Sequence, residues 1–138
     1  MSFDDIRSAS VIRYPYLWAR ESDKGELEGR KQRPVAVVFR LVREKRGDGL
    51  ILLAITSQKP AQGRPCVEIP ATERLRAGLD SDKRLWIILD ESNEDVIGKS
   101  FYLQPRAPIG KFGKAFFIIL IQAFLAQKSK TRSVDRNF

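Results

Sequence analysis

The chain has 138 residues and a formal net charge of +8, and this is the usual size of a single domain. It contains no histidine and one cysteine. A Ser-His-Asp triad, a Cys-His dyad, a histidine-ligated metal and an internal disulfide are therefore excluded. A lone cysteine, Cys66, is typical of a reduced, cytoplasmic protein.

Export and membrane segments are not expected. Residues 1–10 are polar and lack the apolar core of a signal peptide. The longest apolar stretch covers residues 115–126, and twelve helical residues are too short to cross a bilayer. We interpret this stretch as a buried helix.

The basic residues are concentrated in two blocks. Residues 31–79 hold 10 basic and 4 acidic side chains, and residues 99–138 hold 8 and 1. Between them, residues 80–98 are acidic on balance. Lysine and arginine displace the counterions that surround phosphates, so this distribution favours a polyanionic partner such as nucleic acid.

The first half of the chain predicts strands joined by loops. Aromatic and β-branched residues predict a strand at 11–18, whose proline places it at an edge or a bend. The charged residues 19–32 form a long loop. A buried strand follows at 34–42, and the Gly-Asp-Gly motif in 44–49 predicts a hairpin turn. The returning strand, 50–56, is apolar on both faces and is expected at the centre of the sheet.

The second half continues with short elements after an open loop at 57–65. We expect a strand at 66–69, a short helix at 71–78, a buried strand at 84–89, an acidic turn at 90–95 and a last short strand at 101–104.

A helix over 112–127 closes the predicted fold, and residues 129–138 are expected to form a flexible basic tail behind a single domain at 1–128. Short strands linked mainly by hairpins, without a helix after each strand, indicate a mainly β (α+β) class: a small antiparallel barrel with a C-terminal helix. The helix is more apolar than one buried stripe requires, so we expect it to pair with a second copy in a homodimer.

Two short elements carry candidate chemistry. Residues 33–38 read Arg-Pro-Val-Ala-Val-Val, with Arg33 where the long loop enters a buried strand. Thr56 and Ser57 end the next strand. Arg33 and Thr56 stand 11 and 7 positions from the hairpin turn, so a bulge or bend that absorbed the offset would bring both to one rim of the barrel.

The order and spacing of these elements resembles the MazF/PemK (Kid) family of toxin endoribonucleases. That family carries Arg-Pro-x-x-Val-Val after its first flexible loop, and its next strand ends in Ile-Thr or a similar pair. The resemblance continues at 67–69 and 86–91 and covers roughly residues 9–127. Ala9 and Ser10 stand where the family opens its first strand with Gly-Asp.

The resemblance implies an SH3-like barrel assembled as a symmetric dimer. It implies cleavage of single-stranded RNA without a metal or cofactor, as part of a type II toxin–antitoxin module. The implied partner is an antitoxin whose acidic, disordered tail covers the RNA groove. The functional positions that carry over are Arg33 and Thr56, with a weaker claim for Ser57.

RNA cleavage without a metal can use the substrate's own 2′-OH as the nucleophile. Arg33 would stabilise charge on the phosphorane, and Thr56 would hydrogen-bond a phosphate oxygen. A carboxylate must take the proton; the first loop offers several, and we prefer the one nearest Arg33 in sequence, Glu28. The others are Glu21, Asp23 and Glu26.

Further side chains are predicted to bind RNA. Arg30, Lys31 and Arg64 are candidates for phosphate contacts, and Tyr14 and Trp18 for stacking on unpaired bases. Two alternatives stay open. One is a toxin of the same fold that acts on a protein such as DNA gyrase, as CcdB relatives do, and the other is a binding module without nuclease activity.

Overall fold

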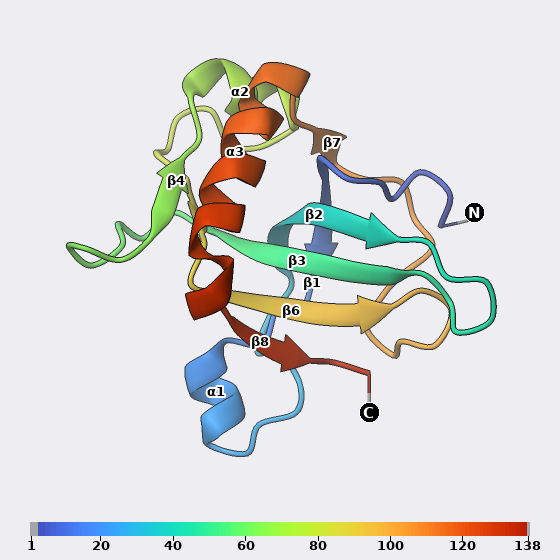
Figure 1. Ribbon diagram of the computed structural model, residues 1–138. Coiled ribbons are helices and arrows are strands. Elements are labelled where there is room, and N and C mark those ends of the chain that lie inside the picture. Colours follow the sequence, from blue (N-terminus) through green and yellow to red (C-terminus); the bar gives the residue numbers. More distant parts are fainter. Residues whose placement is uncertain (1–2, 138) are drawn as a thin grey trace.

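The computed structural model describes residues 3–137, and its main feature is an eight-stranded, largely antiparallel sheet. The main path through the sheet is β4-β5-β3-β2-β1-β7. On the edge of β3 away from β2, β6 pairs beside β5, and β8 pairs with β6 (Figure 1). The predicted class, a small mainly β fold with a helix near its end, is confirmed. The elements are β1 Ser10–Tyr14, α1 Ala19–Asp23, β2 Arg33–Leu41, β3 Gly49–Thr56, β4 Cys66–Glu68, α2 Ala71–Arg76, β5 Trp86–Ile88, β6 Glu91–Val96, β7 Gly110–Lys111, α3 Lys114–Gln127, the 3₁₀ turn η1 Lys128–Lys130, and β8 Arg132–Asp135.

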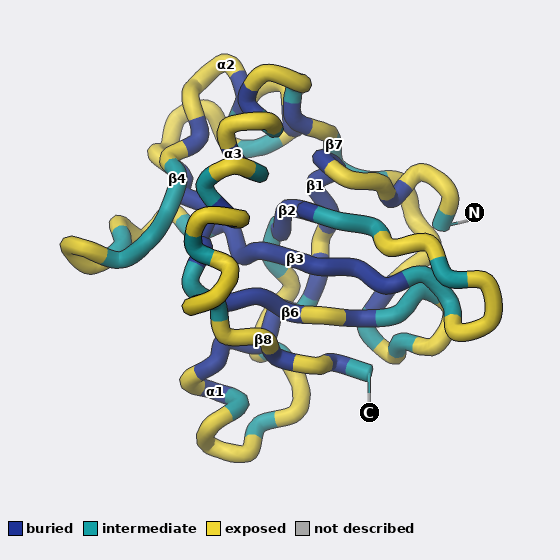
Figure 2. Tube along the Cα trace, in the orientation of Figure 1, coloured by how far each residue is buried: buried dark blue, intermediate teal, exposed yellow. Residues whose placement is uncertain are grey.

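Strand β3 is the centre of the sheet, as its sequence predicts. It pairs with β2, with β6 through its first half, and with β5 through its last two residues. Every residue of β3 except Thr56 is buried, as the continuous dark tube in Figure 2 shows. A strand covered on both faces needs apolar residues throughout, and GLILLAIT supplies them. Thr56 therefore marks the point where β3 leaves the core.

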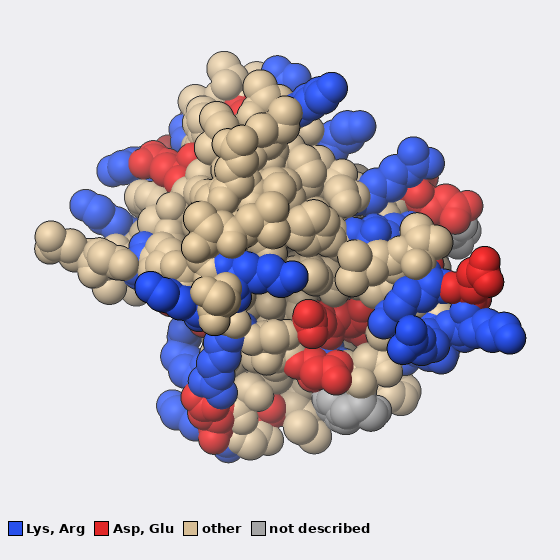
Figure 3. Space-filling view, in the orientation of Figure 1, with Lys and Arg blue, Asp and Glu red and all other residues tan. Residues whose placement is uncertain are grey.

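Helix α3 lies across one face of the sheet (Figure 1). Phe116, Leu120 and Phe124 face the sheet and are buried in its core. On its outer side Ile119 and Leu125 remain about half exposed. Figure 3 shows a broad uncharged surface over this helix. Packing on the sheet therefore uses only part of the apolar surface of α3.

Two polar segments are strands, contrary to the sequence prediction. The expected acidic turn at 90–95 is strand β6, whose alternate side chains point inward to polar partners. The expected flexible tail at 129–138 contains η1 and β8, and β8 pairs in parallel with β6. Val134 and the guanidinium-bearing Arg136 are buried there, so this segment belongs to the same sheet. Residue 138 lies outside the described residues.

The remaining differences are smaller. The strand expected at 11–18 ends at Tyr14, where Pro15 interrupts the ladder. The loop at 19–32 begins with the short helix α1. The strand expected at 101–104 is absent: residues 101 and 102 form a bend, 103 and 104 have no regular structure, and Phe101 is 89% exposed. The hairpin turn lies between β2 and β3 as predicted.

Candidate nucleic-acid interface

Strand register brings Arg33 and Thr56 together. Between β2 and β3, Phe39 pairs with Ile51, whereas Val37 pairs with Leu52, so Val38 is an extra residue in β2. Beyond this bulge the ladder runs regularly to the Val35–Ala54 pair, and two further steps place Arg33 opposite Thr56. The bulge thus removes part of the sequence offset, and both side chains line one cavity.

This cavity, which we call the arginine cavity, has a volume of about 420 Å³, and the charged residues of its lining are mostly basic. Its charged side chains come from β1, from the loop that enters β2, and from the loops that precede β5. They are Arg13, Lys31, Arg33, Asp80 and Lys83. Asp80 is the one acidic residue among the described residues that line it. Such a lining suits a polyanion.

The guanidinium of Arg33 is half-buried at the edge of this cavity. Burial lowers its pKa; the nearby carboxylate of Glu21 opposes the shift, and the charge of Arg20 adds to it. The guanidinium lies 5.0 Å from the centre of the Trp18 ring. It is therefore held against an aromatic surface in a partly dry site, where a fixed positive charge acts most strongly on an anion.

A second cavity, the tryptophan cavity, lies on the other side of Thr56. It has a volume of about 270 Å³ and shares Thr56 and Gln58 with the arginine cavity. Its lining holds three basic side chains and no acidic ones among the described residues. The full lining is Trp18, Arg20, Thr56, Gln58, Lys59, Pro60, Ala61, Arg64 and Ile88.

Thr56 stands at the boundary of the two cavities with its hydroxyl proton available. Its Oγ1 accepts a hydrogen bond of 3.1 Å from the backbone N–H of Gln58. This contact uses an oxygen lone pair and fixes the start of the loop. No acceptor within residues 3–137 takes the hydroxyl hydrogen, which can be donated to an anionic oxygen in either cavity.

Trp18 gathers three guanidinium groups. Those of Arg20, Arg33 and Arg64 lie 4.9, 5.0 and 5.9 Å from its ring centre. Trp18 is only 7% exposed, so its ring is a platform for cations in the free protein rather than an open surface for a stacked base. The predicted stacking role of Trp18 has to be revised accordingly.

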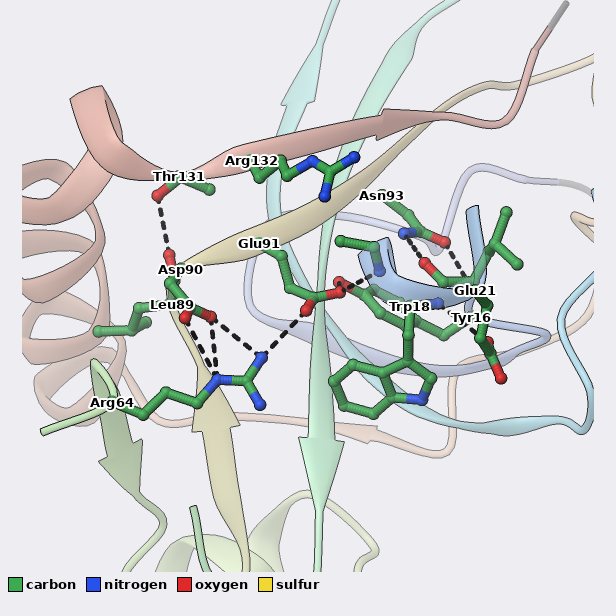
Figure 4. Close-up of polar contacts among 12 residues, drawn as sticks. Tyr16, Trp18, Glu21, Arg64, Leu89, Asp90, Glu91, Asn93, Thr131 and Arg132 are labelled. Carbon is green, nitrogen blue, oxygen red and sulfur yellow. Dashed lines mark hydrogen bonds and ion pairs between the residues drawn. The ribbon is translucent and has the colours of Figure 1, made fainter. Parts of the chain in front are cut away.

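A buried polar cluster fixes the segment that carries Trp18 (Figure 4). Glu91 Oε1 accepts hydrogen bonds from the hydroxyl of Tyr16 at 3.3 Å and from the backbone N–H of Ala19 at 2.9 Å. Its Oε2 lies 3.0 Å from Nη2 of Arg64. Two residues after Glu91 in β6, the side-chain amide of Asn93 accepts a hydrogen bond from the backbone N–H of Leu17 and donates one to its carbonyl. Strand β6 thereby positions Trp18 and Arg64 on one wall of the tryptophan cavity.

Tyr14 lies inside the protein, contrary to its predicted role. It is fully buried, and its hydroxyl donates a 2.6 Å hydrogen bond to Asp95. Burial raises its pKa, and the charge of Asp95 acts in the same direction. A side chain without solvent access does not stack on RNA, so this assignment was wrong.

The preferred base, Glu28, is exposed and does not line either cavity. The carboxylate that the structure brings toward Arg33 is Glu21, which is buried and accepts the backbone N–H of Trp18 at 3.1 Å. Glu21 also forms an ion pair of 2.9 Å with Arg30. Glu28 as the base therefore has no geometric support.

The other predicted phosphate contacts divide into two groups. Lys31 and Ser57 line the arginine cavity as expected. Arg30 is paired with Glu21 and Glu26, and Arg64 with Asp90 and Glu91, so part of their charge is already compensated. Sequence reasoning missed several lining residues, namely Arg13, Arg20, Gln58, Lys59, Asp80 and Lys83. For Arg13 a signal existed, because it is the one outward-facing residue of an otherwise buried strand.

No model of a known protein family matches the chain, and no curated protein sequence matches it. Over residues 3–137, no group of three or more acidic or cysteine side chains is placed to hold a metal ion. Within that same range, no helix is long and apolar enough to span a bilayer.

Proposed function

We propose that this protein is a toxin-like endoribonuclease that cleaves single-stranded RNA through the substrate's 2′-OH. The observation that carries the proposal is the alignment of Arg33 and Thr56 on the rim between two basic cavities. The resemblance of the same two residues to the MazF/PemK motif supports it. The proposal also includes a cytoplasmic location, where such an enzyme meets unpaired RNA.

In the proposed reaction the 2′-oxygen attacks phosphorus, and the bond from phosphorus to the 5′-oxygen breaks. The products are a 2′,3′-cyclic phosphate and a free 5′-OH. Arg33 stabilises the negative charge that builds on the phosphorane, and Thr56 donates a hydrogen bond to a non-bridging oxygen. The proton of the 2′-OH passes to a carboxylate, and the 5′-oxygen takes a proton from solvent water as it leaves.

Asp80 replaces Glu28 as the proposed base. It is the acidic residue that lines the arginine cavity, and one of its oxygens accepts the backbone N–H of Asp82 at 2.9 Å. The second oxygen remains available for a proton. Asp80→Asn keeps the shape and removes the basicity, so it tests this role.

The charge of the two cavities supports binding of the RNA backbone. Seven basic side chains line them, against one acidic side chain among the described residues. Each neutralised phosphate of a single strand contributes about −0.7 to the slope of log affinity against log salt. Affinity for unstructured RNA should therefore fall steeply as salt is raised.

The decisive experiment is cleavage of a long unstructured RNA by folded variants. Arg33→Ala should lose about 10²–10³ in rate, the usual cost of removing one preorganised donor. Thr56→Ala should lose less, because a neutral hydroxyl stabilises charge more weakly than a guanidinium. The matched control is Arg84→Ala: Arg84 is exposed, ion-paired with Glu68 and absent from both cavity linings.

Each outcome separates the proposed function from its alternatives. Cleavage should persist in EDTA, because the 2′-OH and Arg33 supply the nucleophile and the charge. A folded Arg33→Ala protein with full activity would refute the site. RNA binding without cleavage by the wild type would identify a binding module, and neither binding nor cleavage would favour a toxin that acts on a protein.

An acidic antitoxin segment is the proposed protein partner. The same seven basic side chains that suit RNA phosphates suit a row of carboxylates. Such a segment should compete with RNA, so an acidic peptide should weaken RNA binding in wild type and less so in a variant with Lys59 and Lys83 changed to glutamine. Equal competition in both proteins would place the peptide elsewhere.

A further inference from the structure

The lining of the tryptophan cavity contains more than phosphate binding requires. Its buried side is formed by Ile88, which is 1% exposed, and by the Trp18 ring. Pro60 and Ala61, from the open loop after β3, form another wall. The basic groups Arg20, Lys59 and Arg64 complete the lining. The lining is polar on balance, and an aromatic wall beside positive charge fits a molecule that is flat at one end and anionic at the other.

Gln58 adds an uncharged hydrogen-bonding group to the lining of this cavity. Its backbone N–H is used by Thr56, but its side-chain amide makes no hydrogen bond within the described part of the chain, and the residue is exposed. A primary amide offers a donor and an acceptor side by side. That arrangement matches the Watson–Crick edge of an unpaired nucleobase, whereas a phosphate offers acceptors only.

We propose that the tryptophan cavity binds one unpaired nucleobase, that of the nucleotide next to the phosphate held by Arg33 and Thr56, and that Gln58 reads the edge of this base. This inference rests on the proposed function and names the substrate subsite that determines sequence preference. Thr56 and Gln58 belong to both cavities, so a phosphate on one side and a base on the other are one nucleotide step apart. Arg20, which has no ion pair in the described residues, is the group free to move off the ring as the base enters.

The test measures binding with probes that cannot be cleaved. The probes are decamers of abasic spacer nucleotides, one fully abasic and four carrying a single central 2′-fluoro A, C, G or U. All five have the same charge. We expect at least one base to strengthen binding about fivefold or more over the abasic decamer, the factor that one well-placed hydrogen-bonding pair supplies.

Variants on one loop locate the effect. In Gln58→Ala, the affinities for the most tightly and the least tightly bound of the four base-carrying decamers should differ by no more than about twofold. Gln62→Ala, on the same loop but outside both linings, should leave the wild-type order unchanged. In a Trp86→Phe background, Trp18 is the remaining tryptophan, and the preferred base should quench its fluorescence more than the abasic decamer does.

Several results would overturn the proposal. Equal affinity for all five decamers would mean that only the backbone is bound. Unchanged discrimination in Gln58→Ala, or equal quenching by the preferred and abasic decamers, would place the base elsewhere. If the wild type discriminates between bases but never cleaves RNA, the proposed nuclease activity is refuted and the base subsite is supported. If it cleaves RNA without discriminating between bases, the base subsite is refuted and the nuclease activity is supported. Failure to bind any decamer would refute the subsite.

Discussion

Replacing Glu91 by alanine should destabilise the protein strongly, because one carboxylate satisfies several buried donors. Glu91 is only 6% exposed. Its carboxylate oxygens accept hydrogen bonds from the Tyr16 hydroxyl, the Ala19 N–H and the Arg64 guanidinium. Leaving a buried donor without a partner costs about 1–3 kcal/mol. Tyr16 and Ala19 are both buried, while Arg64 is partly exposed and keeps Asp90. The expected loss in the free energy of unfolding is therefore about 3–5 kcal/mol.

Such a loss is a large part of the total stability of a typical domain, about 5–15 kcal/mol. Urea denaturation followed by circular dichroism measures it directly. Glu91→Gln keeps one acceptor oxygen and should lose less than half as much. The control is Glu94→Ala on the same strand, which is exposed and should change stability by less than about 0.5 kcal/mol. If the free energy of unfolding of Glu91→Ala lay within about 1 kcal/mol of the wild-type value, water would be replacing the carboxylate. The conclusion that Glu91 fixes the segment carrying Trp18 would then be wrong.

Three further predictions address other parts of the molecule. Ala9 has a φ of +78°, so Ala9→Gly should raise the free energy of unfolding by about 1 kcal/mol in the same urea experiment, and a loss would show that the strain is absent. Burial raises the pKa of Tyr14 and Tyr16 above the ordinary 10.0, so the stability that their protonated forms contribute is present below about pH 10 and is lost as the pH rises further. In an alkaline titration at 295 nm both should ionise only as the far-ultraviolet signal of the fold disappears, and ionisation in the folded protein near pH 10 would contradict their buried placement. We also propose that the exposed face of α3 pairs with a second copy: light scattering should report about twice 15.8 kDa for the wild type and one such mass for Ile119→Asp, and a wild-type monomer at micromolar concentration would remove the proposal.

The elements that the sequence predicted well are those whose side-chain pattern has a single explanation. Strands β2 and β3 are long and rich in branched apolar residues, and the Gly-Asp-Gly turn joins them. The prediction that Arg33 and Thr56 meet at one rim followed from that hairpin together with a bulge or bend of unspecified position. The bulge at Val38 that aligns them has no residue signature, because its side chain is buried like its neighbours.

The failures share a physical cause, which is polar side chains that face inward. Glu91, Asn93 and Asp95 alternate along β6 and are all buried, yet in the sequence they resemble a solvated turn. Arg136 made the final segment look like a basic tail, although it is 1% exposed and bonds the carbonyl of Pro15. Tyr14 looked available for stacking for the same reason. Buried polar pairs are long-range partnerships, and a local pattern does not reveal them.

Because of the bulge at Val38, the two ends of the β2–β3 hairpin also differ in how well they tolerate insertions and deletions. Residues inserted into the connection at 42–48 lie beyond the last pair, Leu41 with Gly49, and leave every other pair in place. One residue deleted between the bulge and Arg33 would instead turn that side chain to the opposite face of the sheet. Natural variation in length should therefore accumulate in the hairpin tip, and the five positions from Arg33 to Val37 should keep their number even where their side chains change.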